Sequence, residues 1–191
     1  MNAPLLENEH VKLTLLDLSN YTYLLPISSQ INLVQYSPIN ISTKESLKDY
    51  VQTAVDNYYH NIDIPFIVYD KHRKSYAGTT RFMHIDKKNK VVEIGSTWIG
   101  REFQGTGLNK QMKFLMLQYA FENMCFEKVE FRIDERNIRS RKAVENLGAI
   151  QEGVLRKDIL MLDGFRRSSC RYGILKEEWP QIKDTIFKGY F

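Results

Sequence analysis

The segment that decides the fold is Trp98–Lys110, W-I-G-R-E-F-Q-G-T-G-L-N-K. An apolar run ends there, a glycine-rich turn follows, and a long amphipathic pattern begins near Leu108. The start of a helix offers unpaired N–H groups and a positive dipole end, and phosphates bind such a point. Gly105 and Gly107 permit close approach of the backbone to a ligand. No P-loop lysine or third fingerprint glycine follows, so spacing alone leaves a plain strand–helix turn open.

Strand and helix patterns extend outward from this turn in both directions. Strands are expected at 10–16, 64–69, 76–85, 91–99, 127–133, 150–162 and 165–175, and helices at 43–60, after 105 and at 137–147. Ser42 and Glu45 predict a capping box for the first long helix, and Pro26 is expected to stop a short helix begun near Asp17. Asp163-Gly164 predicts a hairpin turn.

The order of these segments predicts the sheet. Short polar turns join the three strands between 64 and 99 into an antiparallel meander, whereas the strand–helix–strand passage through 91–133 predicts a parallel crossover. We expect an α+β domain with a mixed, mostly antiparallel, twisted sheet of about seven strands flanked by helices. One domain is expected over 1–191, with 176–191 as a closing helix or tail.

Composition favours an ordinary globular protein. The formal net charge is +4, from 27 Lys and Arg against 23 Asp and Glu, which is too mild to predict nucleic-acid binding. Cys125 and Cys170 match neither metal-ligand spacing nor a disulfide framework, so no metal is predicted. The first residues do not read as a signal peptide, and no apolar run is long enough to span a bilayer. A cytoplasmic protein without membrane or nucleic-acid partners is therefore expected.

Two segments carry a family resemblance. Gln104-Gly105-Thr106-Gly107-Leu108-Asn109 resembles the Q/R-x-x-G-x-G/A signature of the GNAT acetyltransferases, with Asn109 in place of the usual small residue. The resemblance implies a GNAT fold and acetyl-CoA as cosubstrate, with the pyrophosphate held by the backbone amides of this loop. It also implies that backbone groups of Trp98 and Ile99 pair with pantetheine.

The second segment is Asn137–Gly148, N-I-R-S-R-K-A-V-E-N-L-G, which is similar to the family's N-x-x-S/A helix beside the pantetheine arm. Asn137 is a predicted N-cap and a partner for pantetheine amides, and Gly148 a predicted C-cap glycine. Ser140, together with Glu93-Ile94-Gly95, is similar to the branch related to the RimJ and RimL ribosomal-protein acetyltransferases.

Two residues are expected to act in catalysis. Acetyl transfer needs a neutral amine, and Glu93 is the candidate base, with a plain strand carboxylate as the alternative. The position where many GNAT enzymes carry a proton-donating Tyr is Val144 here, so Ser140 becomes the candidate partner of the CoA sulfur, with Tyr172 as a weaker one. Ser140 supporting only the helix cap is the competing interpretation.

Several arginines in the second half of the chain have alternative roles. Arg136, Arg139 and Arg141, with Lys142, either meet CoA phosphates or form a solvated helix face. Arg166-Arg167 either contact an acidic substrate or partner, or lie in a solvated turn.

The sequence therefore predicts direct acetyl transfer to a primary amine, either a small molecule or a protein N-terminus, without an acyl-enzyme. A non-catalytic acetyl-CoA-binding sensor is the alternative, and a nucleic-acid-binding domain is a third hypothesis that rests only on the mild positive charge and the arginine clusters. A homodimer through an edge strand is a further expectation. The identity of the acceptor cannot be read from the sequence.

Overall fold

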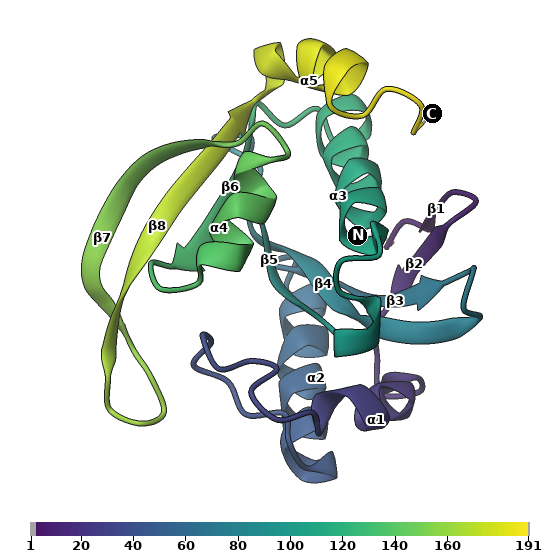
Figure 1. The fold of residues 1–191 in the computed structure, drawn as a ribbon, viewed down its shortest axis with the longest axis vertical. Helices are drawn as coiled ribbons and strands as arrows, with labels where there is room; N and C mark the ends of the chain where they lie inside the picture. The colour runs from purple at the N-terminus through teal and green to yellow at the C-terminus, as the bar shows by residue number, and fades with distance from the viewer. Residues whose placement is uncertain (1–2, 191) are drawn as a thin grey trace.

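The sheet organises the part of the chain that the computed structural model describes, residues 3–190. Its strands lie in the order β1-β2-β3-β4-β5-β6-β8-β7 (Figure 1). Their bounds are β1 Leu6–Glu7, β2 Val11–Leu15, β3 Ile64–Asp70, β4 Ser75–Asp86, β5 Val91–Ile99, β6 Lys128–Asp134, β7 Ile150–Leu160 and β8 Arg166–Leu175. The sheet has eight strands where about seven were expected, because the two-residue β1 adds to the edge of β2 and buries Leu6.

Helices connect and cover the strands. The α-helices are α1 Leu25–Ser28, α2 Lys44–Tyr59, α3 Leu108–Gln118, α4 Ile138–Glu145 and α5 Trp179–Thr185. Short 3₁₀ turns are η1 Tyr21–Leu24, η2 Arg101–Phe103 and η4 Lys176–Glu178, and α3 continues into a π-helical turn, η3, Tyr119–Asn123. No helix within residues 3–190 is long and apolar enough to cross a membrane.

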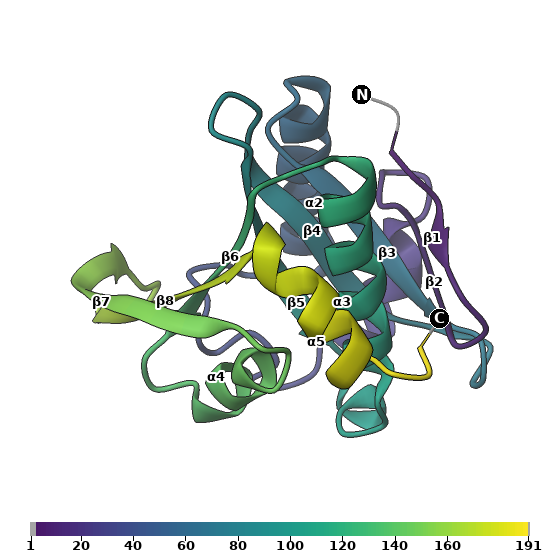
Figure 2. The ribbon, with the colours of Figure 1, turned by 90° about the horizontal axis from the view of Figure 1, so that it is seen from above.

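The long helices α2 and α3 cover opposite faces of the sheet, as two adjacent residues of β4 show. Arg81 lies over the ring of Tyr50 on α2, with 4.4 Å between its guanidinium carbon and the ring centroid. Thr80, whose side chain points the other way, accepts a hydrogen bond from Lys113 on α3. In the view from above, α3 and α5 lie in front of the sheet and α2 behind it (Figure 2).

The predicted parallel crossover is confirmed, and its extent matters for the site. β5 and β6 are the one parallel pair among the described strands. They pair only from Val91 opposite Lys128 to Glu93 opposite Glu130. Beyond Glu93 no further residue of β5 pairs with β6 in the described chain. The hairpin at Asp163-Gly164 is also confirmed, with the Met161 N–H donating to the Phe165 carbonyl at 2.8 Å.

Two local predictions were wrong. Thr43, not Ser42, caps α2, since the Ser46 N–H donates to Thr43 Oγ1 at 3.1 Å and Ser46 completes the capping box. The Ser42 hydroxyl instead donates to Asn40 at 2.8 Å. Pro26 does not stop a helix but lies in the first turn of α1, where a missing N–H leaves no intrahelical bond unmade.

Candidate functional site

A cleft opens where β5 and β6 separate. Its volume is about 1460 Å³, and its walls come from the ends of β5 and β6, the loop before α3, α4 and the segment after α1. Eight of the residues expected to hold the cosubstrate or the thioester line it: Trp98, Ile99, Gln104, Gly105, Gly107, Asn109, Asn137 and Ser140. Thr106 and Leu108 lie in the same loop but do not line the cleft. Chain segments some forty residues apart in sequence thus meet in one cavity.

The glycine-rich loop has the geometry of an open helix start. Gly105 and Gly107 have φ of 79° and 90°, in the left-handed region that favours glycine. A Cβ added at either position would meet nothing within 4 Å, so the space over the loop is free for a ligand. Gly107 is the N-cap of α3 and provides no side-chain cap. The Leu108 N–H donates to Thr106 Oγ1 at 3.4 Å and the Lys110 N–H to the Gly107 carbonyl at 2.9 Å, which leaves the Asn109 N–H available in the first turn. Leu108, in contrast, packs into the core.

Side chains beside the loop fix its shape. The Gln104 amide donates to the Ile99 carbonyl at 2.9 Å and accepts a bond from Arg139 Nη1. Thr106 Oγ1 donates to the Phe103 carbonyl at 2.7 Å. Arg139 is therefore the member of the predicted basic cluster that lies at the glycine-loop end of the cleft. Arg136 instead forms an ion pair with Asp134, in contact with its carboxylate at 2.7 Å.

A β-bulge in β5 shapes the cleft wall. The register between β4 and β5 shifts between Thr79 and Arg81, and Ser96 adopts a φ of 46°, which is unusual for a residue other than glycine. The Tyr50 hydroxyl lies 2.8 Å from Ser96 Oγ and holds this conformation. Gly78 of β4, which pairs with Ile99, must be a glycine, since a Cβ there would lie 2.1 Å from the Trp98 carbonyl oxygen. No local sequence pattern predicts that Ser96 and Tyr50 meet, because they belong to segments 46 residues apart.

Helix α4 begins beside this wall. The predicted N-cap is confirmed, because Asn137 Oδ1 accepts the Ser140 N–H at 3.1 Å. Ser140 therefore supports the cap through its backbone while its side chain lines the cleft, so the two interpretations are compatible. Val144 is buried and apolar. The Tyr172 hydroxyl does not reach the cleft, since it donates to Glu145 at 2.8 Å and accepts from Arg141 at 3.0 Å.

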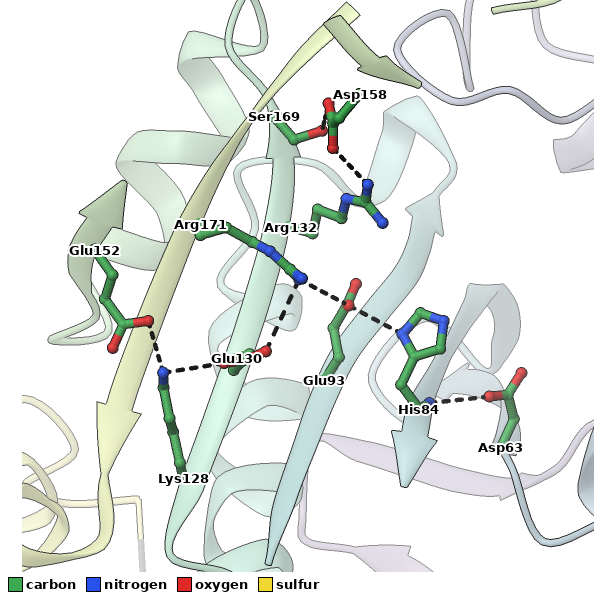
Figure 3. Close-up of polar contacts among 10 residues, drawn as sticks. All are labelled: Asp63, His84, Glu93, Lys128, Glu130, Arg132, Glu152, Asp158, Ser169 and Arg171. Carbon is green, nitrogen blue, oxygen red and sulfur yellow. Dashed lines mark hydrogen bonds and ion pairs between the residues drawn. The ribbon is translucent and has the colours of Figure 1, made fainter. Parts of the chain in front are cut away.

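Glu93 lies at the vertex where β5 and β6 part, next to the cleft but not in its lining (Figure 3). Its side chain is 8% exposed, and one carboxylate oxygen contacts His84 Nδ1 at 3.1 Å and Arg171 Nη1 at 3.5 Å. A Cβ at Gly95, which does line the cleft, would come within 3.1 Å of the other oxygen. Because Gly95 has no side chain, the Glu93 carboxylate occupies the space directly beside this residue of the cleft wall.

His84 was assigned no role from the sequence, yet it connects Glu93 to water. Its side chain is 61% exposed. The hydrogen bond to Glu93 raises the pKa of His84 above its usual value, against the opposing effect of burial. His84 lies nine residues before Glu93, on the other strand of the β4–β5 hairpin. Once the register of the two strands is known, this spacing identifies His84 as a neighbour of Glu93.

Lys113 is a second residue that sequence reasoning missed. It lies on the buried face of α3, 4% exposed, and lines the cleft. Its Nζ donates to Thr97 Oγ1 at 2.8 Å and to Thr80 Oγ1 at 3.3 Å. Burial lowers the pKa of Lys113 to about 7. The signal for burial that the sequence offers is that Lys113 directly follows Met112, a member of the apolar stripe of α3.

No three His, Cys, Asp or Glu residues within the described range cluster in a way that would hold a metal ion. Neither cysteine lines the cleft: Cys125 is exposed on the turn after α3, and Cys170 is buried in β8, where it pairs with Ile133 of the cleft wall. The site is therefore built from backbone amides, a carboxylate with its histidine, a serine and a buried lysine.

A sheet with one split parallel pair, and a cleft there that opens onto a glycine-rich helix start, define an acyl-CoA-dependent class of transferase fold. A family model described as an acetyltransferase (GNAT) domain matches residues 11–150. The chain belongs to the GNAT family of N-acetyltransferases, and membership implies use of acetyl-CoA.

Individual relatives agree with this assignment. The chain is 32% identical over 109 residues to "Putative ribosomal N-acetyltransferase YdaF" of Bacillus subtilis (strain 168), covering 57% of this chain and 58% of that protein. It is 25% identical over 175 residues to "Uncharacterized N-acetyltransferase p20" of Bacillus licheniformis, covering 91% of this chain and 97% of that protein. A GCN5-related N-acetyltransferase structure from Brucella melitensis has the same fold, with a TM-score of 0.91, 24% identity, and coverage of 100% of this chain and 87% of that one.

Proposed function

We propose that this N-acetyltransferase moves the acetyl group of acetyl-CoA directly to a primary amine, either a protein N-terminus or a small molecule, with Glu93 as base. The observation that carries the proposal is the joint position of Glu93 and the glycine loop. Glu93 stands behind Gly95 at the closed vertex of the cleft, and the open start of α3 stands at its mouth. A cosubstrate with phosphates at one end and a thioester at the other would place the phosphates at the glycine loop and the thioester near Glu93.

The binding end of the cosubstrate is assigned to backbone groups. The first-turn Asn109 N–H of α3 and the loop from Gln104 to Asn109 bind the pyrophosphate, with Arg139 beside them. The strand edge of β5 at Trp98 and Ile99, unpaired with β6, binds the pantetheine amides, and Asn137 and Ser140 line the opposite wall. Backbone N–H groups released by the same separation are donors to the carbonyl oxygen as it gains charge.

The chemical step needs the acceptor as a free amine, because only its lone pair attacks the thioester carbon. Glu93 takes a proton from the ammonium, directly or through water, and His84 passes it to solvent. The C–N bond then forms and the C–S bond breaks, and the nitrogen loses its second proton to water. The leaving thiolate accepts a hydrogen bond from Ser140 and takes up a proton from water. No covalent acyl-enzyme is involved, and the positions of Cys125 and Cys170 support that.

Two observations bear on the class of acceptor: the name of a similar protein and the geometry of the cleft. The similar Bacillus subtilis protein bears a ribosomal N-acetyltransferase name, which supports a protein N-terminus, although the alignment spans only 58% of that protein. The part of the cleft beyond Glu93 is lined by Arg132, Asp134 and Arg167 and by the segment 32–37, which is open enough for either an extended peptide end or a small amine.

The first experiment is calorimetric titration with acetyl-CoA of wild type, Gly107→Trp and Gly164→Trp. Gly164 is the matched control, since it is another glycine at positive φ with nothing within 4 Å of an added Cβ, but it lies in the β7–β8 turn. Saturable binding lost only in Gly107→Trp is the expected result. Transfer to an amine and peptide panel then tests the reaction. Binding without transfer to any amine would support the alternative, an acetyl-CoA sensor.

A further inference from the structure

One arginine at the acceptor end of the cleft has no carboxylate partner in the part of the chain that the structure describes. Strand alternation places Arg167, Ser169 and Arg171 of β8 on the face of the sheet that carries Glu93. Arg167 is 6% exposed and lines the cleft, whereas Arg166 next to it is exposed on the other side of the strand. The structure therefore separates two residues for which the sequence offered one shared alternative.

The carboxylates on this face already have cationic partners (Figure 3). Glu93 contacts Arg171 and His84, and Asp158 accepts from Arg132 and from Ser169. The remaining carboxylates of the face, with their partners, are Glu130 with Lys128 and Arg171, Glu152 with Lys128, and Asp134 with Arg136.

Arg167 differs from all of these. Among residues 3–190, no carboxylate oxygen lies within 4.0 Å of its guanidinium. Its Nη1 donates to the Tyr36 carbonyl, and its Nε is buried without a partner. Arg132, also in the lining, has a buried Nε without a partner as well. Asp134 and Asp158 are near enough to favour the charge but not to pair with it.

A buried charge of this kind is costly, and a bound anion offsets the cost. Burial lowers the pKa of Arg167, yet a guanidinium stays protonated in proteins, so the positive charge remains. A guanidinium has five donors arranged to bind carboxylate or phosphate, and Tyr36 uses one of them. A cationic acceptor such as a polyamine would find no free carboxylate here and one free positive charge.

We propose that the acceptor carries a carboxylate or phosphate several bonds from its reacting amine, and that Arg167 binds this anionic group. This inference rests on the proposed function, because it assumes that the amine reacts near Glu93. Arg171, which contacts Glu93, and Arg167 are four residues apart on β8, about 13 Å at the rise of a strand. The anion therefore belongs to a group beyond the carbon that bears the amine.

The test compares acceptors in matched pairs that differ only in charge. One pair is the peptides Ala-Ala-Glu and Ala-Ala-Gln, both C-terminally amidated. The other pair is ε-aminocaproate and its amide. Using both pairs distinguishes a peptide acceptor from a small-molecule acceptor. Spermidine is the cationic arm. Each is assayed for kcat/KM and, independently, for binding to protein saturated with CoA, in wild type, Arg167→Gln, Arg167→Lys and the control Arg166→Gln.

In wild type and in Arg166→Gln, the carboxylate member of at least one pair is expected to exceed its amide roughly 10- to 100-fold, the effect of a charge-assisted hydrogen bond. Arg167→Gln, whose amide retains a donor for the Tyr36 carbonyl, should bring that ratio to about one, and Arg167→Lys should restore part of it. The pair that shows the effect identifies the source of the anion.

Two results would overturn the proposal. One is a wild-type protein without charge preference in either pair, or with a preference for spermidine. The other is an Arg167→Gln variant that loses the same factor for both members of a pair, since that indicates a role confined to holding the Tyr36 segment. Failure of transfer to every amine, with the binding preference intact and dependent on Arg167, would instead contradict the proposed function and leave the anion site standing.

Discussion

Lys113 provides the sharpest test of the structure, because a buried amine makes stability depend on pH in a definite direction. The perturbation is Lys113→Met, which retains an unbranched side chain of similar length and removes the amine. The hydroxyls of Thr80 and Thr97 remain paired with each other at 2.8 Å, so the substitution leaves neither of them without a partner.

The size of the effect on the free energy of unfolding follows from the pKa shift of Lys113. The pKa falls from 10.5 to about 7, and each unit corresponds to about 1.4 kcal/mol, so at pH below 7 burial of the charged amine costs about 5 kcal/mol. Between pH 7 and 10.5 the unfolded chain binds the proton and the folded chain does not, so the free energy of unfolding rises with pH. From pH 7 to 9 the gain of wild type relative to Lys113→Met is about 2 kcal/mol.

The assay is urea unfolding of both proteins at intervals from pH 6 to 10, followed by thermal melts. Lys113→Met should be the more stable protein at pH 6, and its advantage should shrink as pH rises. For a chain of this length the change from pH 7 to 9 corresponds to roughly 4–8 °C in Tm. Groups such as Cys170 and Tyr172 titrate in both proteins, so the difference between the two isolates Lys113.

Parallel stability curves over this range would refute the reasoning, because they would mean that Lys113 is solvated or paired in the folded protein. A variant less stable than wild type at pH 6 would also contradict it, since the hydrogen bonds to Thr80 and Thr97 would then outweigh the desolvation of the charge.

Three further predictions concern catalysis, pH and helix capping. Glu93→Gln should lower kcat by about 10²- to 10⁴-fold, the usual contribution of a general base, and leave acetyl-CoA affinity unchanged by calorimetry. His84→Gln should cost stability below about pH 6.5, where the raised pKa keeps His84 charged beside Glu93, and this cost should vanish as pH rises through the folded pKa. Thr43→Ala should destabilise the protein by about 1 kcal/mol in urea titrations, whereas Ser42→Ala should change little.

Each of these has an outcome that counts against it. Unchanged turnover across pH in Glu93→Gln removes that residue from the mechanism. A pH-independent stability difference for His84→Gln means that the ion pair with Glu93 does not form. Equal effects at Thr43 and Ser42 mean that neither hydroxyl caps α2.

Residues with local signals were the ones that sequence reasoning placed correctly. Asn137 and Gly148 bracket α4 as expected, because a cap depends on neighbours three or four residues away. Capping also shows the limit of such signals, since Ser42 and Thr43 are adjacent and chemically alike. Which one caps α2 depends on where the preceding chain turns, and there Asn40 binds Ser42.

The acceptor end of the cleft shows what long-range pairing adds. Arg166 and Arg167 look equivalent in the sequence, yet the register of β8 with β6 and β7 turns one outward and buries the other. His84 and Glu93 meet where the register of β4 and β5 shifts between Met83 and Asp86, a stretch in which His84 has a φ of 50°. These contacts span segments whose relative register is set by the whole sheet.

The sequence by itself determined the alternation of strands and helices, the open glycine loop before α3, the caps of α4 and the class of reaction, since each depends on residues close together in the chain. Tertiary structure alone decided that β5 and β6 separate after Glu93, that Lys113 is buried with no carboxylate partner among residues 3–190, and that Arg167 faces the cleft. The physical reason is that burial and the charge partners of a side chain depend on segments distant in sequence, which only packing of the complete sheet brings together.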